Sequence, residues 1–224
     1  MSQPASPDRI EVPVWDGLLR AFHWSLVGLV SAAIATGLAG GDWMAWHARA
    51  GEAIGALLVL RLSWGLWGSR YARFTQFWPT PTRVVAYLRG RWQRLGHNPL
   101  GALSVLAVLA LLIFQVLSGL VGNDEIAFTG PWAGAIDEAL SLQLTRWHRL
   151  TAKLLYGWIG LHLAAIAVHT FLKRHPLLRA MWTGRQPGDP EGAAARVPAW
   201  RVVASLLLAL AAGVVAASPG LLGF

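Results

Sequence analysis

Long runs without a charged residue constrain this chain more than any other feature. Four windows contain no Asp, Glu, Lys or Arg, and each is close to or above the ~20 residues that a membrane-spanning helix needs. They cover residues 21–41, 99–123, 154–172 and 202–224. A fifth apolar window, residues 47–67, is interrupted only by Arg49, Glu52 and Arg61. Since 13% of the residues are charged, against about a quarter in soluble domains, the sequence predicts an all-α membrane protein with five spans.

The basic residues predict the orientation. A net charge of +8 could indicate a nucleic-acid partner, but the arginines gather in particular connections between spans. Residues 68–98 hold six arginines and no acid, and the segment just after Leu172 holds Lys173, Arg174, Arg179 and Arg185. The third connection instead carries Asp124, Glu125, Asp137 and Glu138. Because positive connections stay in the cytoplasm, we expect a cytoplasmic N-terminus, a periplasmic C-terminus, no removable signal peptide and no nucleic-acid partner.

The chain has no cysteine. This excludes disulfides, cysteine-ligated iron–sulfur clusters, thiolate zinc sites and covalently attached c-type haem. A bound metal would therefore have nitrogen or oxygen ligands.

Histidines are the candidate ligands, and the chain has seven. Two of them, His97 and His175, stand beside prolines in cytoplasmic connections and are predicted to be ordinary solvated residues. The other five lie within or at the ends of the predicted spans: His23, His47, His148, His162 and His169.

The spacing of four histidines predicts two levels. His148 and His162 are 14 residues apart, which places them within about 40° on one helix face and roughly 21 Å apart in depth. Counted from the short outer connection, His23 and His47 differ in depth by a similar amount. His47 is then level with His148, and His23 with His162. Two facing imidazole pairs suit bis-histidine ligation of two non-covalent b haems in a helix bundle, whereas zinc would draw its ligands into one tetrahedron.

Further residues could contact the cofactors at these two depths. Arg61 follows His47 by 14 residues, so it could meet a propionate of the inner haem or extend to the headgroups. His169 competes with His162; we favour His162 as the ligand, with His169 as a supporting group on the propionate or quinone side.

Glu52 and Lys153 could pair with each other or handle protons. Five glycines could admit a flat haem or simply allow close helix packing: Gly51, Gly55, Gly119, Gly157 and Gly160.

Several segments resemble a known family. They are "VWDGLLRAFHW", "WHARAGEAIG", "GNDEIAFTGPWAG" and "WHRLTAKLLYGWIGLHLAAIAVHTFLKRHPLLRAMWTGR". Over residues 12–186 the chain resembles the bacterial di-haem cytochrome b561 family, which is grouped with the cytochrome b subunit of Ni,Fe-hydrogenases. The resemblance implies a four-helix haem bundle in the inner membrane, with His23, His47, His148 and His162 at the family's ligand positions.

The expected architecture is therefore a four-helix transmembrane haem-binding bundle in residues 1–186, followed by a linker and a fifth C-terminal transmembrane helix in residues 187–224. The resemblance implies electron transfer between membrane quinone and a periplasmic hydrogenase, dehydrogenase or c-type cytochrome. The alternative is a stand-alone enzyme that oxidises superoxide and reduces quinone. We favour an electron-transfer subunit, with lipid and quinone as partners and a homodimer as an option.

Overall fold

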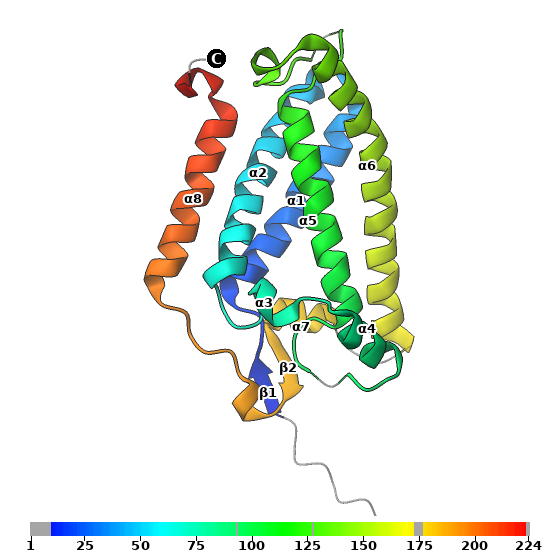
Figure 1. Ribbon diagram of the computed structural model, residues 1–224, viewed down its shortest axis with the longest axis vertical. Helices are drawn as coiled ribbons and strands as arrows, with labels where there is room; N and C mark the ends of the chain where they lie inside the picture. Colours follow the sequence, from blue (N-terminus) through cyan, green and yellow to red (C-terminus); the bar gives the residue numbers. More distant parts are fainter. Residues whose placement is uncertain (1–9, 93, 127, 173–176, 223–224) are drawn as a thin grey trace, which may run out of the picture.

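The computed structural model describes residues 10–92, 94–126, 128–172 and 177–222. Its long helices stand side by side, and short elements close both ends of the bundle (Figure 1). The α-helices are α1 (Gly17–Ala39), α2 (Met44–Trp67), α3 (Phe74–Phe77), α4 (Pro81–Leu88), α5 (Pro99–Leu120), α6 (Glu138–Ala167), α7 (Leu177–Thr183) and α8 (Ala199–Ala217). The other elements are strands β1 (Ile10–Pro13) and β2 (Arg185–Gly188), the π-helix η3 (Val168–Leu172), and the 3-10 helices η1 (Gly41–Trp43), η2 (Ala133–Ala135), η4 (Pro190–Gly192) and η5 (Pro219–Leu222).

Side-chain caps explain where three of the long helices begin. Asp16 accepts a hydrogen bond from the Leu19 amide at the start of α1, and Asn98 accepts one from Gly101 at the start of α5. Asp137 accepts bonds from the first amides of α6. Such caps satisfy amide groups that have no partner within the helix. The cap at Asp137 starts α6 sixteen residues before the apolar window, so one continuous helix carries both His148 and His162.

Four helices in the described part of the chain are long and apolar enough to cross a membrane. They are α1, α5, α6 with its π-helical extension, and α8. The second predicted span forms α2, which has 24 residues but is more polar because Arg49, Glu52 and Arg61 lie within it.

The last helix is docked along α2 (Figure 1). At one end the Trp67 indole donates to the Ser205 hydroxyl (3.1 Å), and the Arg201 guanidinium donates to the Trp67 carbonyl (3.0 Å). At the other end the Trp132 indole donates to the Ala216 carbonyl (3.0 Å). Thus α8 covers one side of α2.

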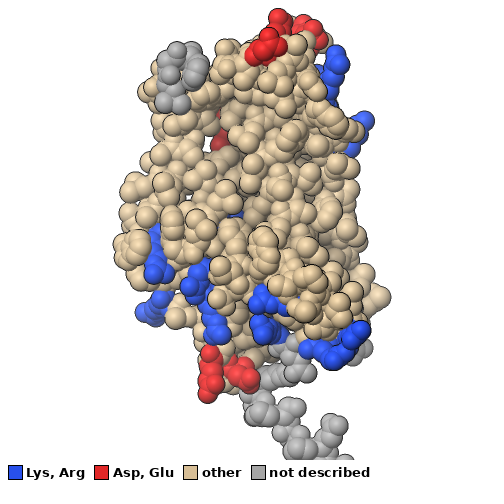
Figure 2. Space-filling view, in the orientation of Figure 1, with Lys and Arg blue, Asp and Glu red and all other residues tan. Residues whose placement is uncertain are grey.

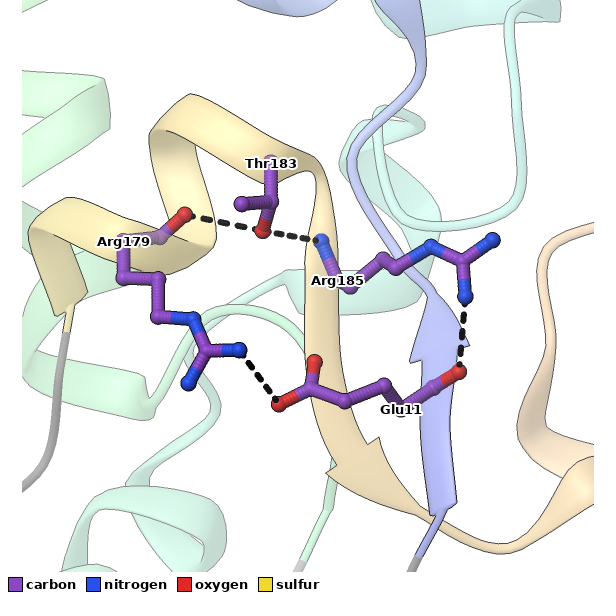
Figure 3. A network of polar contacts seen from close by, with 4 residues as sticks. All are labelled: Glu11, Arg179, Thr183 and Arg185. Carbon is purple, nitrogen blue, oxygen red and sulfur yellow. Dashed lines mark hydrogen bonds and ion pairs between the residues drawn. The ribbon is translucent and has the colours of Figure 1, made fainter.

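Two short strands depart from the all-helical expectation. β1 and β2 pair antiparallel, with Ile10 opposite Gly188 and Pro13 opposite Arg185. Beside them Arg185 donates to the Glu11 carbonyl, while Arg179 lies 3.9 Å from the Glu11 carboxylate (Figure 3). The pair joins the segment before α1 to the segment after α7.

The two ends of the bundle differ in charge. Most Lys and Arg side chains visible in Figure 2 gather at the end formed by α3, α4 and α7, whereas acidic side chains lie at the opposite end and also at the tip of the basic end. The described chain also begins at the basic end and finishes at the other (Figure 1).

Candidate functional site

His47 and His148 form a close pair at the acidic end of the bundle. His47 stands in the first turn of α2, His148 lies on α6, and their ring centroids are 6.0 Å apart with planes at 79°. Both rings line one cavity of about 520 Å³ between α1, α2, α5 and α6. This volume is in the range of sites for small ligands and cofactors.

Neighbouring groups define the tautomers of this outer pair. His47 Nδ1 lies 2.8 Å from the Ala33 carbonyl, which only accepts hydrogen bonds, so Nδ1 carries the proton. His148 Nδ1 lies 3.1 Å from the Ser118 hydroxyl, which donates its own proton to the Phe114 carbonyl and can accept from Nδ1. Among the described residues neither Nε2 atom takes part in a hydrogen bond. Both Nε2 lone pairs are thus free to bind a metal.

Glycines allow these rings to lie close to helix backbones. A Cβ atom at Gly37 would stand 2.8 Å from His47 Nδ1, and one at Gly119 would stand 3.2 Å from His148 Cε1. The sequence indicated Gly119 as a candidate but did not indicate Gly37. At Gly55 an added Cβ would meet Val116, so that glycine serves helix packing, whereas Gly51, Gly157 and Gly160 face open space.

His23 and His162 form a looser inner pair. His23 on α1 is half-buried and His162 on α6 is exposed, yet they lie close enough to interact electrostatically. Their helices do not pack closely, because α6 lies mainly along α5. The two imidazoles thus come from helices that are not packed against each other.

Arg61 is buried beneath the inner pair. Its side chain is 2% exposed, and its Nη1 donates to the Ala72 carbonyl (3.1 Å). The guanidinium carbon lies 4.7 Å from the ring centroid of Phe74 and 5.8 Å from that of Phe77. The alternative in which Arg61 extends to the headgroups is therefore wrong.

The prediction that His97 is a solvated loop residue is also wrong. Its ring centroid lies 4.6 Å from those of both Trp15 and Phe77, and its Nδ1 is buried. Burial lowers the pKa of His97 to about 3, and the neighbouring Arg61 and His23 act in the same direction. His97 precedes the Asn98 cap of α5, a position whose side chain often packs against the structure; that was the available signal.

The remaining candidates have other partners. His169, in the π-helix, has Nδ1 2.9 Å from the Ala165 carbonyl and Nε2 3.4 Å from the Tyr87 hydroxyl. Glu52 forms an ion pair with Arg49 (3.0 Å) and has none with Lys153 among the described side chains. His175 falls outside the residues that the structure describes.

A zinc-like site is not formed in the described part of the chain, where no three His, Asp or Glu side chains gather around one point. The histidines instead come together two by two. A comparison with family models matches the prokaryotic cytochrome b561 model to residues 14–184. The chain belongs to the prokaryotic cytochrome b561 family. It is therefore a multi-pass membrane cytochrome of b type, which binds haem b and transfers electrons.

The match ends before α8 begins, so this last helix lies outside the matched segment. Neither the curated proteins nor the solved structures include a match to this chain.

Proposed function

We propose that the chain binds two b haems at two depths and passes electrons between a periplasmic redox protein and membrane quinone. His47 and His148 would hold the outer haem through their imidazole nitrogens, and His23 and His162 would hold the inner haem. The observation that carries the proposal is the outer pair, in which both Nδ1 atoms are hydrogen-bonded and both Nε2 atoms are free.

The separation of the outer rings fits this assignment. Bonds from imidazole nitrogen to a metal are about 2 Å long in zinc sites, so two rings on opposite sides of one ion have centroids roughly 6 Å apart. The observed separation is 6.0 Å. The glycines beside both rings leave room for this approach.

The chain holds and shields the outer site. Haem b, when bound, supplies an iron centre that takes up and releases one electron. The bonds from Nδ1 to Ala33 and Ser118 orient the two imidazoles and strengthen them as ligands. Buried Ile54, Leu112 and Leu155 line the cavity and limit access of water.

The same reasoning favours His162 over His169 as the inner ligand on α6. Both nitrogens of His169 already face partners, Ala165 and Tyr87. His162 instead lies close enough to His23 to interact with it electrostatically, and no hydrogen bond of its ring is found among the described residues. His169 then supports the structure near the cytoplasmic surface.

In the membrane, α2 is the additional span, giving five in all. Its charged groups are shielded: Arg61 is buried, Glu52 is paired with Arg49, and α1 and α8 lie along the helix. The basic end faces the cytoplasm by the positive-inside rule. The proposed location is the inner membrane, with the N-terminus inside and the C-terminus in the periplasm.

A second candidate function is the oxidation of superoxide with reduction of quinone. Arg149 and Lys153 line the outer cavity and would attract an anion. Rapid reduction of the haems by superoxide, together with no reaction with any periplasmic redox protein, would favour this enzyme.

Haem stoichiometry tests the main proposal. A pyridine haemochrome assay on the purified protein should give two b haems per chain, with low-spin bis-imidazole spectra. His169→Ala is the matched control on the same helix and should retain both haems. One haem per chain would refute the two-level assignment, and a chain without haem would refute the proposal as a whole.

A further inference from the structure

Among the buried nitrogen atoms that have no hydrogen-bond partner in the described residues, two belong to side chains that share the ring of Phe77 as a neighbour. They are Nη2 of Arg61 and Nδ1 of His97. Arg61 is a charged side chain of which 2% is exposed. An unsatisfied buried cation costs several kcal/mol of free energy unless an anion accompanies it.

The two nitrogens belong to one buried cluster of side chains, named here the Arg61 pocket, which consists of Arg61, His97 and the rings of Trp15, Phe74 and Phe77. Arg61 and His97 share the ring of Phe77 as a wall, with the guanidinium carbon 5.8 Å and the imidazole centroid 4.6 Å from its centroid. Trp15 closes the other side of His97, and Phe74 packs on Arg61. The charge of Arg61 is also felt at His97. These aromatic rings thus surround two nitrogens without a described partner, and Nδ1 of His97 is a donor when it carries the imidazole proton.

The nearest acid does not fill this pocket. Asp16 is close enough to influence Arg61, but its carboxylate is engaged elsewhere. It accepts hydrogen bonds from the Leu19 amide, the Trp64 indole (3.0 Å) and the Ser69 hydroxyl (2.5 Å). Within the described residues Arg61 has no carboxylate within ion-pair distance.

A carboxylate is the ligand that best matches these donors. Its two oxygens can accept from one arm of a guanidinium and from an imidazole N–H, and such charge-assisted bonds are short and strong. His23, one of the proposed inner ligands, lies close enough to His97 to interact with it electrostatically. The pocket consequently lies beside the inner haem site.

We propose that Arg61 and His97 together bind a propionate carboxylate of the inner haem. This inference rests on the proposed function and adds His97, a residue outside the ligand set. It also explains why an arginine is buried in α2 and why the connection before α5 folds back against the bundle. The loop histidine thus links the cytoplasmic connection to the cofactor.

The test removes the carboxylate from the haem and the donors from the protein. Apoprotein carrying His148→Ala, which lacks an outer ligand, is titrated with haem b or with its dimethyl ester. We expect the ester to bind about ten- to a hundredfold more weakly, because hydrogen bonds to charged groups are worth about 1.5–3 kcal/mol. With Arg61→Gln added, haem b and the ester should bind almost equally.

Further variants keep the test decisive. The ester penalty is the factor by which the dimethyl ester binds more weakly than haem b. His97→Phe retains an aromatic ring between Trp15 and Phe77 and should reduce this penalty in part. If the glutamine variant of Arg61 fails to fold, Arg61→Lys replaces it and should retain some of the penalty. Arg70→Gln removes an exposed cation of the same end and should leave the full penalty. A penalty that is unchanged in both the Arg61 and the His97 variants would overturn the inference.

Two further outcomes would contradict the propionate assignment in different ways. If haem affinity depends on Arg61 only in nanodiscs with anionic lipid, or if added acetate abolishes the dependence of haem affinity on Arg61, the pocket holds a headgroup or a free anion and the assignment is wrong. If no form of the protein binds haem at the inner level, the proposed function fails. If the inner haem binds, but the loss of affinity caused by the ester and the loss caused by the mutation simply add, only the propionate contact is refuted.

Discussion

The outer and inner histidine pairs are held by different means. In the outer pair each ring has an Nδ1 partner and lies against a glycine, and the rings are 6.0 Å apart. In the inner pair His162 is exposed and α1 stands away from α6. Polar order at the inner level lies below the imidazoles, in Arg61 and His97.

This difference indicates how each level depends on its cofactor. Local hydrogen bonds preorganise the outer imidazoles before any ligand binds. The inner level has few contacts of its own, so a cofactor that spans His23, His162 and the Arg61 pocket would join helices that otherwise touch little. We therefore expect the outer level to be sensitive to single neighbours of the rings and the inner level to its ligands and the arginine.

The largest predicted effect is loss of one haem of two. His148→Ala should remove the outer haem and leave the inner one, and His162→Ala should do the reverse, because each change deletes one axial ligand and leaves the other pair intact. Haem content per chain and a potentiometric titration distinguish the two. Should His169→Ala, and not His162→Ala, abolish the inner haem, the inner level lies two helical turns deeper than proposed.

A side chain at Gly37 should disturb the outer level alone. Since even a Cβ there would stand 2.8 Å from His47 Nδ1, Gly37→Val must displace the ring and break its bond to Ala33. We expect outer haem affinity to fall by more than about tenfold, the range for lost supporting contacts of metal ligands, with the inner haem unchanged. Gly28→Val on the same helix, where an added Cβ meets nothing within 4 Å, is the control. Equal losses in the two variants would show that helix α1, not the ring, was perturbed.

Much of the fold follows from the sequence because hydropathy reports which helices contact lipid. The four uninterrupted windows correspond to α1, α5, α6 and α8. The window at Leu154 did not reveal the start of α6 at Glu138, since the first half of that helix is polar. The docking of α8 depends on single bonds such as Trp67 to Ser205, which no hydropathy pattern encodes.

The site divides in the same way. The rise per residue of a helix is sufficient to place His47 level with His148, and these residues do lie together. The helical rise carries no information about the segments that connect helices, so the burial of His97 was missed. Gly37 was missed because its role depends on the angle between α1 and α2, which brings its backbone to His47.

Removing the hydroxyl beside His148 should have a moderate effect on the outer level. Ser118→Ala removes the hydroxyl that faces Nδ1 and leaves the Gln115 backbone carbonyl as the acceptor for the imidazole, so the ring loses part of its fixed orientation and some strength as a ligand. We expect outer haem affinity to fall about tenfold, measured by haem titration of the apoprotein. The control, Ser104→Ala on the same helix, loses a bond from Trp158 and should spare the outer haem. An unaltered affinity in Ser118→Ala would mean that the Ala33 and Gln115 carbonyls are sufficient to orient the pair.

The smallest predicted effect concerns the acids above the outer level. Their negative charge should attract a basic periplasmic partner, whose association would then be slowed by salt. Asp124 is a poor residue to change, because its carboxylate accepts the amides of Ile126 and Phe128 and so shapes the connection. Glu125 and Glu138 are exposed and better suited.

We expect Glu125→Gln combined with Glu138→Gln to slow electron exchange with the partner a few-fold at low ionic strength. The two proteins should react at the same rate in high salt, because screening removes the attraction between exposed charges. Stopped-flow reduction of the haems at increasing ionic strength measures this, and haem content should stay unchanged. The control removes two acids at the opposite end, with Glu11→Gln and Glu191→Gln, and so lowers the negative charge by the same amount. This control should leave the rate of electron exchange unchanged, because the partner meets only the outer level. A rate that falls equally in both double variants would show that overall charge attracts the partner, and one that rises in the outer variant would favour an anionic reactant such as superoxide.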